Sequence, residues 1–514
     1  MKRDGALTSL WQHHMEEFQS ANDNAVANKY FDVVIVGGGI TGITTGLLLQ
    51  KAGRKVLIAE AHSICFGTTG GTTAHLNTLF DTPYDEVEKK FSKEDAQLLA
   101  RATKQSIDLF KRHVNEYNIE CGFKEVPAYL YAQTEEQVEK LDKIFEATER
   151  AGVQVSLSNT IPVHLPFTKA IEIPGQAQIH PSRYVYALAK EFEHAGGVIA
   201  QDCRITGVEE GEVLEIESCM GTIRSKYLIY ATHIPPGVNI LHFRCAPYRS
   251  YAMAVRLKNE ADYPAALAYD LYDPYHYFRT QEVDGKKYLI VGGEDHKTAD
   301  ETNTEACFTK LEAYLRKYYE VDEISFRWSS QYFEPADGLA YIGHLPGHAQ
   351  NMFVATGYSG NGITYSHIAA MTLTDLITTG KSDFEKLFNP GRVKPVAGFS
   401  NFVKEAVDVV GHFIKDPFTK EKIHSLAELA PGEAKIVKYE GDSIALYKDE
   451  NGEVHAVSPA CSHIKCQVGW NSAEKSWDCP CHGSRYNFDG ELLTGPARKD
   501  LQQITVKDLI EEHH

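Results

Sequence analysis

Cysteines and histidines near the C-terminus follow a spacing that suits few metal sites. Cys461 and His463 form a C-x-H motif, and Cys479 and His482 form C-x-x-H after fifteen intervening residues. Zinc fingers place two cysteines in one loop and two histidines in the next, whereas each loop here supplies one of each. In a mixed-ligand [2Fe–2S] cluster, two thiolates hold one iron and two imidazoles hold the other. The spacing therefore predicts a [2Fe–2S] cluster on these four residues rather than zinc.

The sequence around these ligands resembles the Rieske domain over about residues 425–510. Gly469 and Trp470 follow the first ligand loop, and a Gly-Pro pair at 495–496 closes the second. Short apolar runs separated by Gly, Asn and Asp turns predict an all-β module here. The resemblance implies a Rieske-type cluster whose histidines lie at the tip of the module.

The same resemblance assigns roles to four more residues. Ser484 and Tyr486 lie where Rieske proteins of high potential donate hydrogen bonds to a cluster sulfide and a ligand sulfur. Cys466 and Cys481 lie where those proteins have a disulfide between the two loops. Because disulfides are rare in cytosolic proteins, two adjacent free thiols remain the alternative.

A second motif lies near the N-terminus, in FDVVIVGGGITGITTGLLLQKAGRKVLIAE. It reads as a strand at 31–36, a G-x-G-x-x-G loop, a helix and a strand at 55–59. Such glycines permit a tight turn, a close approach to pyrophosphate and close helix–strand packing, while a terminal acid accepts from a ribose hydroxyl. An anion is stabilised at the helix N-terminus. The motif predicts a dinucleotide site formed by Gly37, Gly39, Ile40, Thr41, Gly42 and Glu60.

Two further segments favour FAD over NAD. The loop CFGTTGGTTAHLNT at 65–78 offers backbone and hydroxyl donors to phosphate and flavin. Near residue 351 a strand enters another glycine-rich turn and then a helix, whose N-terminus would face the electron-rich pyrimidine end of a reduced flavin. The candidate residues are Thr68, Thr69, Thr73, Gly357, Gly360, Asn361, Gly362, Ile363 and Thr364.

Together these segments resemble the D-amino-acid oxidase/glycine oxidase/sarcosine oxidase superfamily over roughly residues 30–380. The resemblance implies an α/β FAD-binding (Rossmann-like, GR2-type) domain with ββα layering and an interleaved antiparallel α+β substrate domain. It makes Val208 a candidate for backbone contact with adenine. Some members bind FAD covalently, and His75 and Cys65 lie in the right region, but non-covalent FAD is the expectation.

The resemblance also implies the chemistry, which is oxidation of a C–N bond of an amine or amino acid by hydride transfer to the flavin. Tyr251, Tyr277 and Arg279 are the candidates to line the substrate side. Tyrosines and arginines there suit either a carboxylate clamp or a cage for an amine. Oxidation of a hydroxy acid on the same scaffold is an alternative.

Helical patterns are expected at 84–117, 135–152 and 182–196, and strands at 226–231, 288–291 and 352–355. The predicted organisation is a polar segment at 1–28, the flavin region at 29–380, a connector at 381–424 and the Rieske module at 425–510. The formal charge of −18 without a basic run argues against nucleic-acid binding. No apolar stretch reaches the roughly 18 residues of a membrane span, and no signal peptide is evident, so a cytoplasmic location is expected.

Combining the two cofactors predicts a function. A hydride brings two electrons to the flavin, and a [2Fe–2S] cluster accepts one at a time, so we expect a dehydrogenase that reduces an external one-electron acceptor, a protein or a quinone. A ring-hydroxylating oxygenase would need a 2-His-1-carboxylate iron motif, and a NAD(P)H-dependent reductase would need a second glycine fingerprint. Neither is found in the sequence. A redox-sensing protein with a non-catalytic cluster is the remaining alternative.

Overall fold

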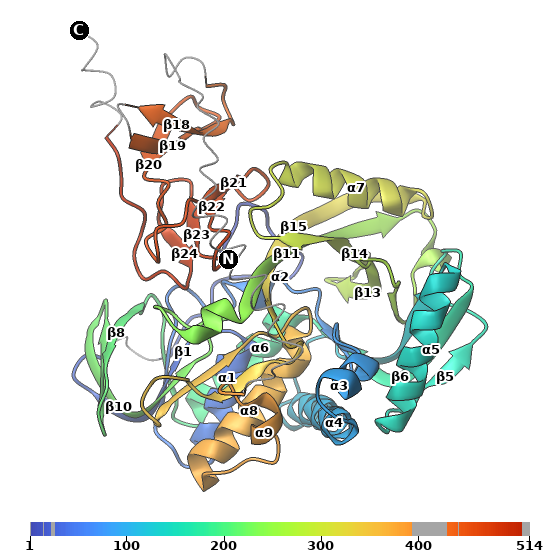
Figure 1. Cartoon of the computed structure of the whole chain (residues 1–514), viewed down its shortest axis with the longest axis horizontal. Helices are drawn as coiled ribbons and strands as arrows, with labels where there is room; N and C mark the ends of the chain where they lie inside the picture. Colours follow the sequence, from blue (N-terminus) through green and yellow to red (C-terminus); the bar gives the residue numbers. More distant parts are fainter. Residues whose placement is uncertain (1, 14, 22–25, 393–428, 440–441, 506–514) are drawn as a thin grey trace.

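The computed structural model describes residues 2–13, 15–21, 26–392, 429–439 and 442–505. It has two large sheets that share the first 392 residues and a small β module after residue 428. In Figure 1 the module lies against one side of the larger body, near the N-terminus of the chain. The expected fold class is confirmed: a Rossmann-like α/β part, an interleaved second sheet and a C-terminal all-β Rieske module.

The first sheet has a parallel centre, as the strand–loop–helix–strand pattern requires. Its order is β16-β17-β10-β1-β2-β7, and β8 and β9 extend β10 as an antiparallel hairpin. These strands are β1 (Tyr30–Val36), β2 (Val56–Ala59), β7 (Val198–Ala200), β8 (Ile205–Glu209), β9 (Leu214–Ser218), β10 (Gly221–Tyr230), β16 (Tyr341–His344) and β17 (Met352–Thr356). All residues of β2 and β17 are buried, as expected for strands covered on both faces.

Helices α1 (Ile40–Lys51), α6 (Pro181–His194) and α8 (Gly362–Thr379) pack beside one another against this sheet (Figure 1). Helix α4 (Lys93–Glu116) packs on α8. The helical pattern expected at 84–117 is broken, because Phe91 leaves helical geometry and Ser92 caps α4 by accepting from the Asp95 amide. The first part is α3 (Tyr84–Lys90).

The second sheet has the order β15-β11-β14-β13-β12-β4-β6-β3, with β5 (Ser156–Ser158) paired to β6. All its pairs are antiparallel except β12 with β4. Helices α5 (Glu135–Arg150) and α7 (Thr304–Arg316) contact its strands. The strands are β3 (His75–Leu76), β4 (Lys124–Ala132), β6 (Lys169–Gln178), β11 (Cys245–Leu257), β12 (Leu267–Tyr269), β13 (Tyr277–Val283), β14 (Lys286–Lys297) and β15 (Val321–Pro335).

The C-terminal module contains a three-stranded and a four-stranded antiparallel sheet. The first comprises β18 (Ala434–Tyr439), β19 (Asp442–Lys448) and β20 (Val454–Val457), and the second comprises β21 (Gly469–Asn471), β22 (Ser476–Asp478), β23 (Arg485–Asn487) and β24 (Leu492–Thr494). Most of the predicted connector at 381–424 lies outside the described residues; its start includes α9 (Glu385–Phe388). The predicted domain boundaries stay predictions.

The N-terminal residues form a strap that joins the larger body of the protein to the Rieske module. Trp11 is fully buried and its indole donates to the Thr72 carbonyl, while Ser9 donates to the Gly70 carbonyl at 2.5 Å. Asp4 pairs with Arg485 of the Rieske module at 2.9 Å. We call residues 3–12 the strap. The strap contacts both the Rieske module and the segment 65–78, which we call the threonine-rich loop.

Candidate functional site

A cavity of about 430 Å³ opens where β1 and β2 end. In open α/β sheets, ligands bind at the carboxyl ends of the strands. The lining includes Gly37, Gly39, Ile40, Thr41 and Glu60, all expected from the first glycine motif.

Gly42 does not line the cavity but permits the turn that forms it. A Cβ atom at Gly42 would lie 1.9 Å from the Gly37 carbonyl oxygen, so only glycine allows α1 to begin this close to the loop. Gly37 has a φ of +114°, and a Cβ there would lie 2.5 Å from the Ala231 carbonyl. The backbone is thus shaped for close approach of a phosphate group.

Glu60 directly follows the last residue of β2, and backbone amides donate hydrogen bonds to its carboxylate. The amides of Gly38 and His62 donate to it at 2.6 Å and 2.8 Å. Burial raises the pKa of this carboxyl. Arg204 lines the cavity nearby and donates to His62 Nε2 at 2.9 Å. This half of the cavity therefore combines the Glu60 carboxylate, the Arg204 guanidinium and main-chain amides. These are the kinds of group that bind the ribose and phosphates of a nucleotide.

The prediction for Val208 needs a correction of register. Val208 is absent from the cavity lining, whereas Cys203, Arg204 and Ile205 belong to it. Val208 lies further along β8, where it pairs with Ile216 and packs on an apolar cluster. The cavity is reached at the start of β8, three residues earlier than expected.

The threonine-rich loop lines the cavity through Thr68, Thr69 and Thr73. The Ile40 amide donates to Thr69 Oγ1 at 3.1 Å, and Thr68 donates to the Gln331 carbonyl at 3.1 Å. The loop therefore joins the start of α1 to β15 of the second sheet.

The second glycine turn lines the cavity through Gly360, Asn361, Gly362 and Ile363, where α8 begins. The other two predicted members have supporting positions. Thr364 is buried and donates to the Asn77 carbonyl at 2.9 Å. Gly357 has a φ of +72° at the turn after β17.

Tyr277, a candidate for the substrate side, lines the other half of the cavity. It lies across the sheet from Gly292, where a Cβ would come within 2.2 Å of the tyrosine hydroxyl oxygen. Its hydroxyl lies 2.9 Å from Ser250 Oγ. The neighbouring lining residues are His75, Asp81, Tyr269, Tyr275, Asp295 and Tyr332.

Tyr251 and Arg279 do not line the cavity, which corrects two predictions. Tyr251 faces the opposite side of the sheet, where its hydroxyl lies 2.9 Å from His296 Nε2 and its ring contacts Phe308. Arg279 is fully buried and donates to the carbonyls of Thr73 and Ala74 at 2.8 Å and 2.6 Å. It fixes the backbone of the threonine-rich loop and is not a clamp for substrate.

Strand β14 has a β-bulge beside the cavity. Opposite Ser250 of β11, strand β14 has two residues, Glu294 and Asp295, and Glu294 has a φ of +58°. Bulges of this kind redirect side chains near active sites. Asp295 of the bulge lines the cavity, and the ordinary alternation of side chains along β11 places Ser250 and Ala252 in the lining and Tyr251 on the other face.

The four predicted cluster ligands lie together in the Rieske module. Cys461 and Cys479 are buried free thiols. In the part of the chain that the structure describes, Nδ1 of His463 and both ring nitrogens of His482 are buried without a hydrogen-bond partner. Buried polar atoms are normally satisfied, so these orphaned nitrogens fit the role of iron ligands.

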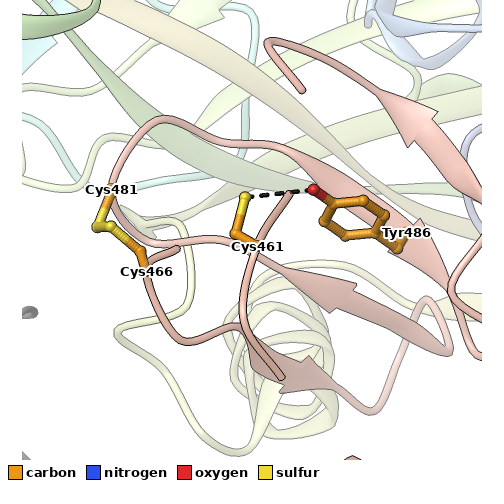
Figure 2. The surroundings of a disulfide bond; sticks show 4 residues. All are labelled: Cys461, Cys466, Cys481 and Tyr486. Atoms are coloured by element: carbon orange, nitrogen blue, oxygen red, sulfur yellow. Dashed lines mark hydrogen bonds between the residues drawn. A yellow bond between two sulfur atoms is a disulfide. The ribbon is translucent and has the colours of Figure 1, made fainter. Parts of the chain in front are cut away.

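Cys466 and Cys481 form a disulfide that joins the two ligand loops, as Figure 2 shows. The Tyr486 hydroxyl lies 3.2 Å from Cys461 Sγ, on the other side of the loop. Cys479 and the Tyr486 hydroxyl both lower the pKa of Cys461, to about 6. The disulfide and the tyrosine contact implied by the Rieske resemblance are therefore present.

The tip of the module faces the segment that follows β10. His463 Nε2 donates to the Gly237 carbonyl at 2.9 Å. The His242 ring, in the short helix Ile240–Phe243, lies 4.9 Å from the His463 ring and 5.5 Å from the His482 ring, centroid to centroid. Both ligand histidines thus contact one segment that follows β10.

Residues of the module also line the FAD cavity, which sequence reasoning missed. Leu493, Thr494, Gly495, Ala497 and Arg498 belong to the lining, as does Asp4 of the strap. Asp81, Asp295 and Tyr332 were missed as well. A single aspartate among 70 acidic residues has no sequence signal, and contacts between distant segments follow only from the fold.

These features define a flavoprotein with a Rieske module docked beside the cavity of its Rossmann-like part. The chain belongs to the FAD dependent oxidoreductase (DAO) family, which it matches over residues 32–376, and it carries a Rieske [2Fe–2S] domain over residues 420–505. It is an oxidoreductase that uses FAD and a [2Fe–2S] cluster.

Several known proteins are similar. The putative Rieske 2Fe-2S iron-sulfur protein YhfW of Bacillus subtilis is 34% identical over 92% of this chain and 93% of its own length. The gamma-glutamylputrescine oxidoreductase of Escherichia coli is 24% identical over 73% of this chain and 92% of its own. The glycine oxidase structure from Geobacillus kaustophilus has a TM-score of 0.59 at 20% identity, covering 71% of this chain and all of the other. Among the described helices, none is long and apolar enough to cross a membrane.

Proposed function

We propose that this protein is a dehydrogenase that oxidises a C–N bond of a small amine or amino acid and reduces an external one-electron acceptor. When bound, FAD would accept a hydride, and the [2Fe–2S] cluster would accept electrons one at a time. The chain's own residues hold the two groups next to each other and shape the substrate half of the cavity.

The observation that carries this proposal is the orientation of the cluster ligands. His463 donates to the Gly237 carbonyl at 2.9 Å, and His482 packs on His242 and Phe243. A cluster on these histidines has its imidazole edges against the part of the chain that binds the flavin. This arrangement suits electron transfer within one molecule.

Hydrogen bonds to main-chain carbonyls of the Rieske module hold it against the larger body. They support a fixed position for the module. Gln331 donates to the Gly483 carbonyl at 2.8 Å, and the Gly237 amide donates to the Pro496 carbonyl at 3.0 Å. Gly483 has a φ of +75°, and a Cβ there would lie 2.8 Å from Gln331 Nε2 and 2.9 Å from Pro247 Cβ. Such close approach needs the glycine, so the second ligand loop and the second sheet fit together closely.

The relatives are consistent with an amine substrate, since one of them is named as an oxidoreductase of gamma-glutamylputrescine. The acceptor, a protein or a quinone, and the cytoplasmic location stay predictions, as does non-covalent attachment of FAD.

An anaerobic substrate panel tests the proposal. Holoenzyme is mixed with primary amines, N-methyl amines, amino acids and hydroxy acids, and flavin absorbance is followed. We expect an amine or amino acid to bleach the flavin, and ferricyanide, a one-electron acceptor, to restore it. If only hydroxy acids bleach the flavin, the proposed amine or amino-acid substrate is wrong. If the protein in air rapidly forms stoichiometric peroxide while the cluster is not reduced, it is an oxidase and not a dehydrogenase.

A further inference from the structure

The substrate half of the cavity is acidic and aromatic. Asp81 and Asp295 line it together with Tyr269, Tyr275 and Tyr332. Tyr332 donates to Asp295 Oδ2 at 2.9 Å. Among the described residues, Asp295 Oδ1 has no hydrogen-bond partner, although it is buried. A buried carboxylate oxygen in this state needs a donor, and Asp295 belongs to the cavity lining.

Asp81 differs from Asp295 because its oxygens are engaged. The Gly360 amide donates to Asp81 Oδ2 at 2.6 Å, and Tyr275 donates to Oδ1 at 3.3 Å. Asp81 thus fixes the turn before α8, whereas Asp295 Oδ1 has no hydrogen-bond partner among the described residues, although the nearby Ser250 hydroxyl helps to lower the pKa of Asp295.

The arginines of the cavity lie away from Asp295. Of the described residues, the arginines that line the cavity are Arg204 and Arg498. Arg204 contacts His62 beside Glu60, and Arg498 donates to the Pro236 carbonyl at 3.4 Å. Arg279, expected as a carboxylate clamp, donates to main-chain carbonyls instead. Lys140 lines the cavity from an exposed position on α5.

We propose that this half of the cavity is a cation site in which Asp295 is the counter-charge for the ammonium group of an amine that has no carboxylate beside its nitrogen. The inference rests on the proposed function and narrows its substrate class from amines and amino acids to amines. Tyrosine faces around a carboxylate suit an ammonium ion, whereas a carboxylate next to the nitrogen would meet Asp295 and Asp81 with no arginine to balance it.

The protonation state of Asp295 gives the site a pH dependence. Burial, with a smaller contribution from Asp81, raises the pKa of Asp295 to about 7 against the opposing effects of Ser250, Tyr332 and His276. Tyr275 and Tyr277 face the same space and stay neutral, because burial raises the pKa of both. An alkylammonium ion stays protonated to about pH 10. Cation affinity should therefore increase as pH rises through 7.

Binding to oxidised holoenzyme tests this without turnover. Butylammonium, butyrate and 2-aminobutyrate are titrated while the perturbation of the flavin spectrum is recorded. We expect butylammonium to bind, with an affinity about 30-fold higher at pH 8.5 than at pH 5.5 for a single group of pKa near 7, and the other two to bind weakly. The Asp295→Asn variant should lose about 30-fold or more in butylammonium affinity at pH 8.5 and lose the pH dependence.

The exposed α4 residue Asp108 provides a matched control, since Asp108→Asn removes the same charge far from the cavity. Tighter binding of butyrate or 2-aminobutyrate than of butylammonium would overturn the proposal, as would a wild-type affinity independent of pH. The wild-type measurements decide even where Asp295→Asn fails to fold. If butylammonium binds through Asp295 but no amine bleaches the flavin, the cation site stands and the proposed function fails.

Discussion

Replacing Cys479 with serine should separate the two halves of the reaction. The variant loses a buried iron ligand, and changes to cluster ligation cost much in metal affinity. We expect reduction of a one-electron acceptor to fall more than about 100-fold, while anaerobic bleaching of the flavin by substrate persists. The flavin cavity keeps its glycine loops in this variant, so bleaching also reports that the chain is folded.

The control for this variant is Cys219→Ser, because Cys219 is an exposed free thiol away from the cluster. It should keep both activities. Iron content and the visible spectrum of the cluster confirm its loss in Cys479→Ser. Undiminished acceptor reduction in a variant that lacks iron would place the cluster off the electron path and favour the sensing alternative.

Replacing Arg485 with methionine should produce the largest loss of stability. Arg485 is fully buried in the Rieske module, donates to Asp4 of the strap at 2.9 Å and to Asp478 at 3.1 Å. Asp478 also lies 3.5 Å from Arg249 of the second sheet. Removing one partner of a buried ion network costs about 3–5 kcal/mol, because the other charges are left uncompensated.

Urea unfolding of the holoenzyme measures this effect, with flavin fluorescence and the visible circular dichroism of the cluster as separate probes. We expect the cluster signal to be lost at lower urea than in the wild type. Arg256→Met is the matched control, since Arg256 forms exposed pairs with Asp322 and Glu323 and should cost no more than about 1 kcal/mol. Equal stability of Arg485→Met and the control would show that the strap does not hold the module.

The parts that the sequence predicts most directly are those set by local spacing. The four cluster ligands lie in two short loops, and the residues of the first glycine loop follow from the geometry of one turn and one helix. Their positions depend little on the rest of the chain. The class of fold followed for the same reason, because each motif belongs to one kind of strand and helix arrangement.

The residues predicted poorly depend on register and on distant contacts. Tyr251 lies between Ser250 and Ala252, which line the cavity, so the alternation of side chains along β11 turns it to the other face. Arg279 is on the expected strand, but its guanidinium donates to carbonyls of the threonine-rich loop, which lies more than two hundred positions earlier in the chain. The strap and the docking of the module join the two ends of the sequence, and no local pattern indicates such contacts.

Anaerobic rapid mixing with an amine that bleaches the flavin tests the central claim most directly. Flavin absorbance and the electron paramagnetic resonance signal of the reduced cluster are followed on one time course at several protein concentrations. The docked arrangement predicts that the cluster signal grows as the flavin is partly reoxidised, at a rate independent of protein concentration. A bleached flavin beside a cluster that stays oxidised, or a rate proportional to protein concentration, would contradict electron transfer within one molecule.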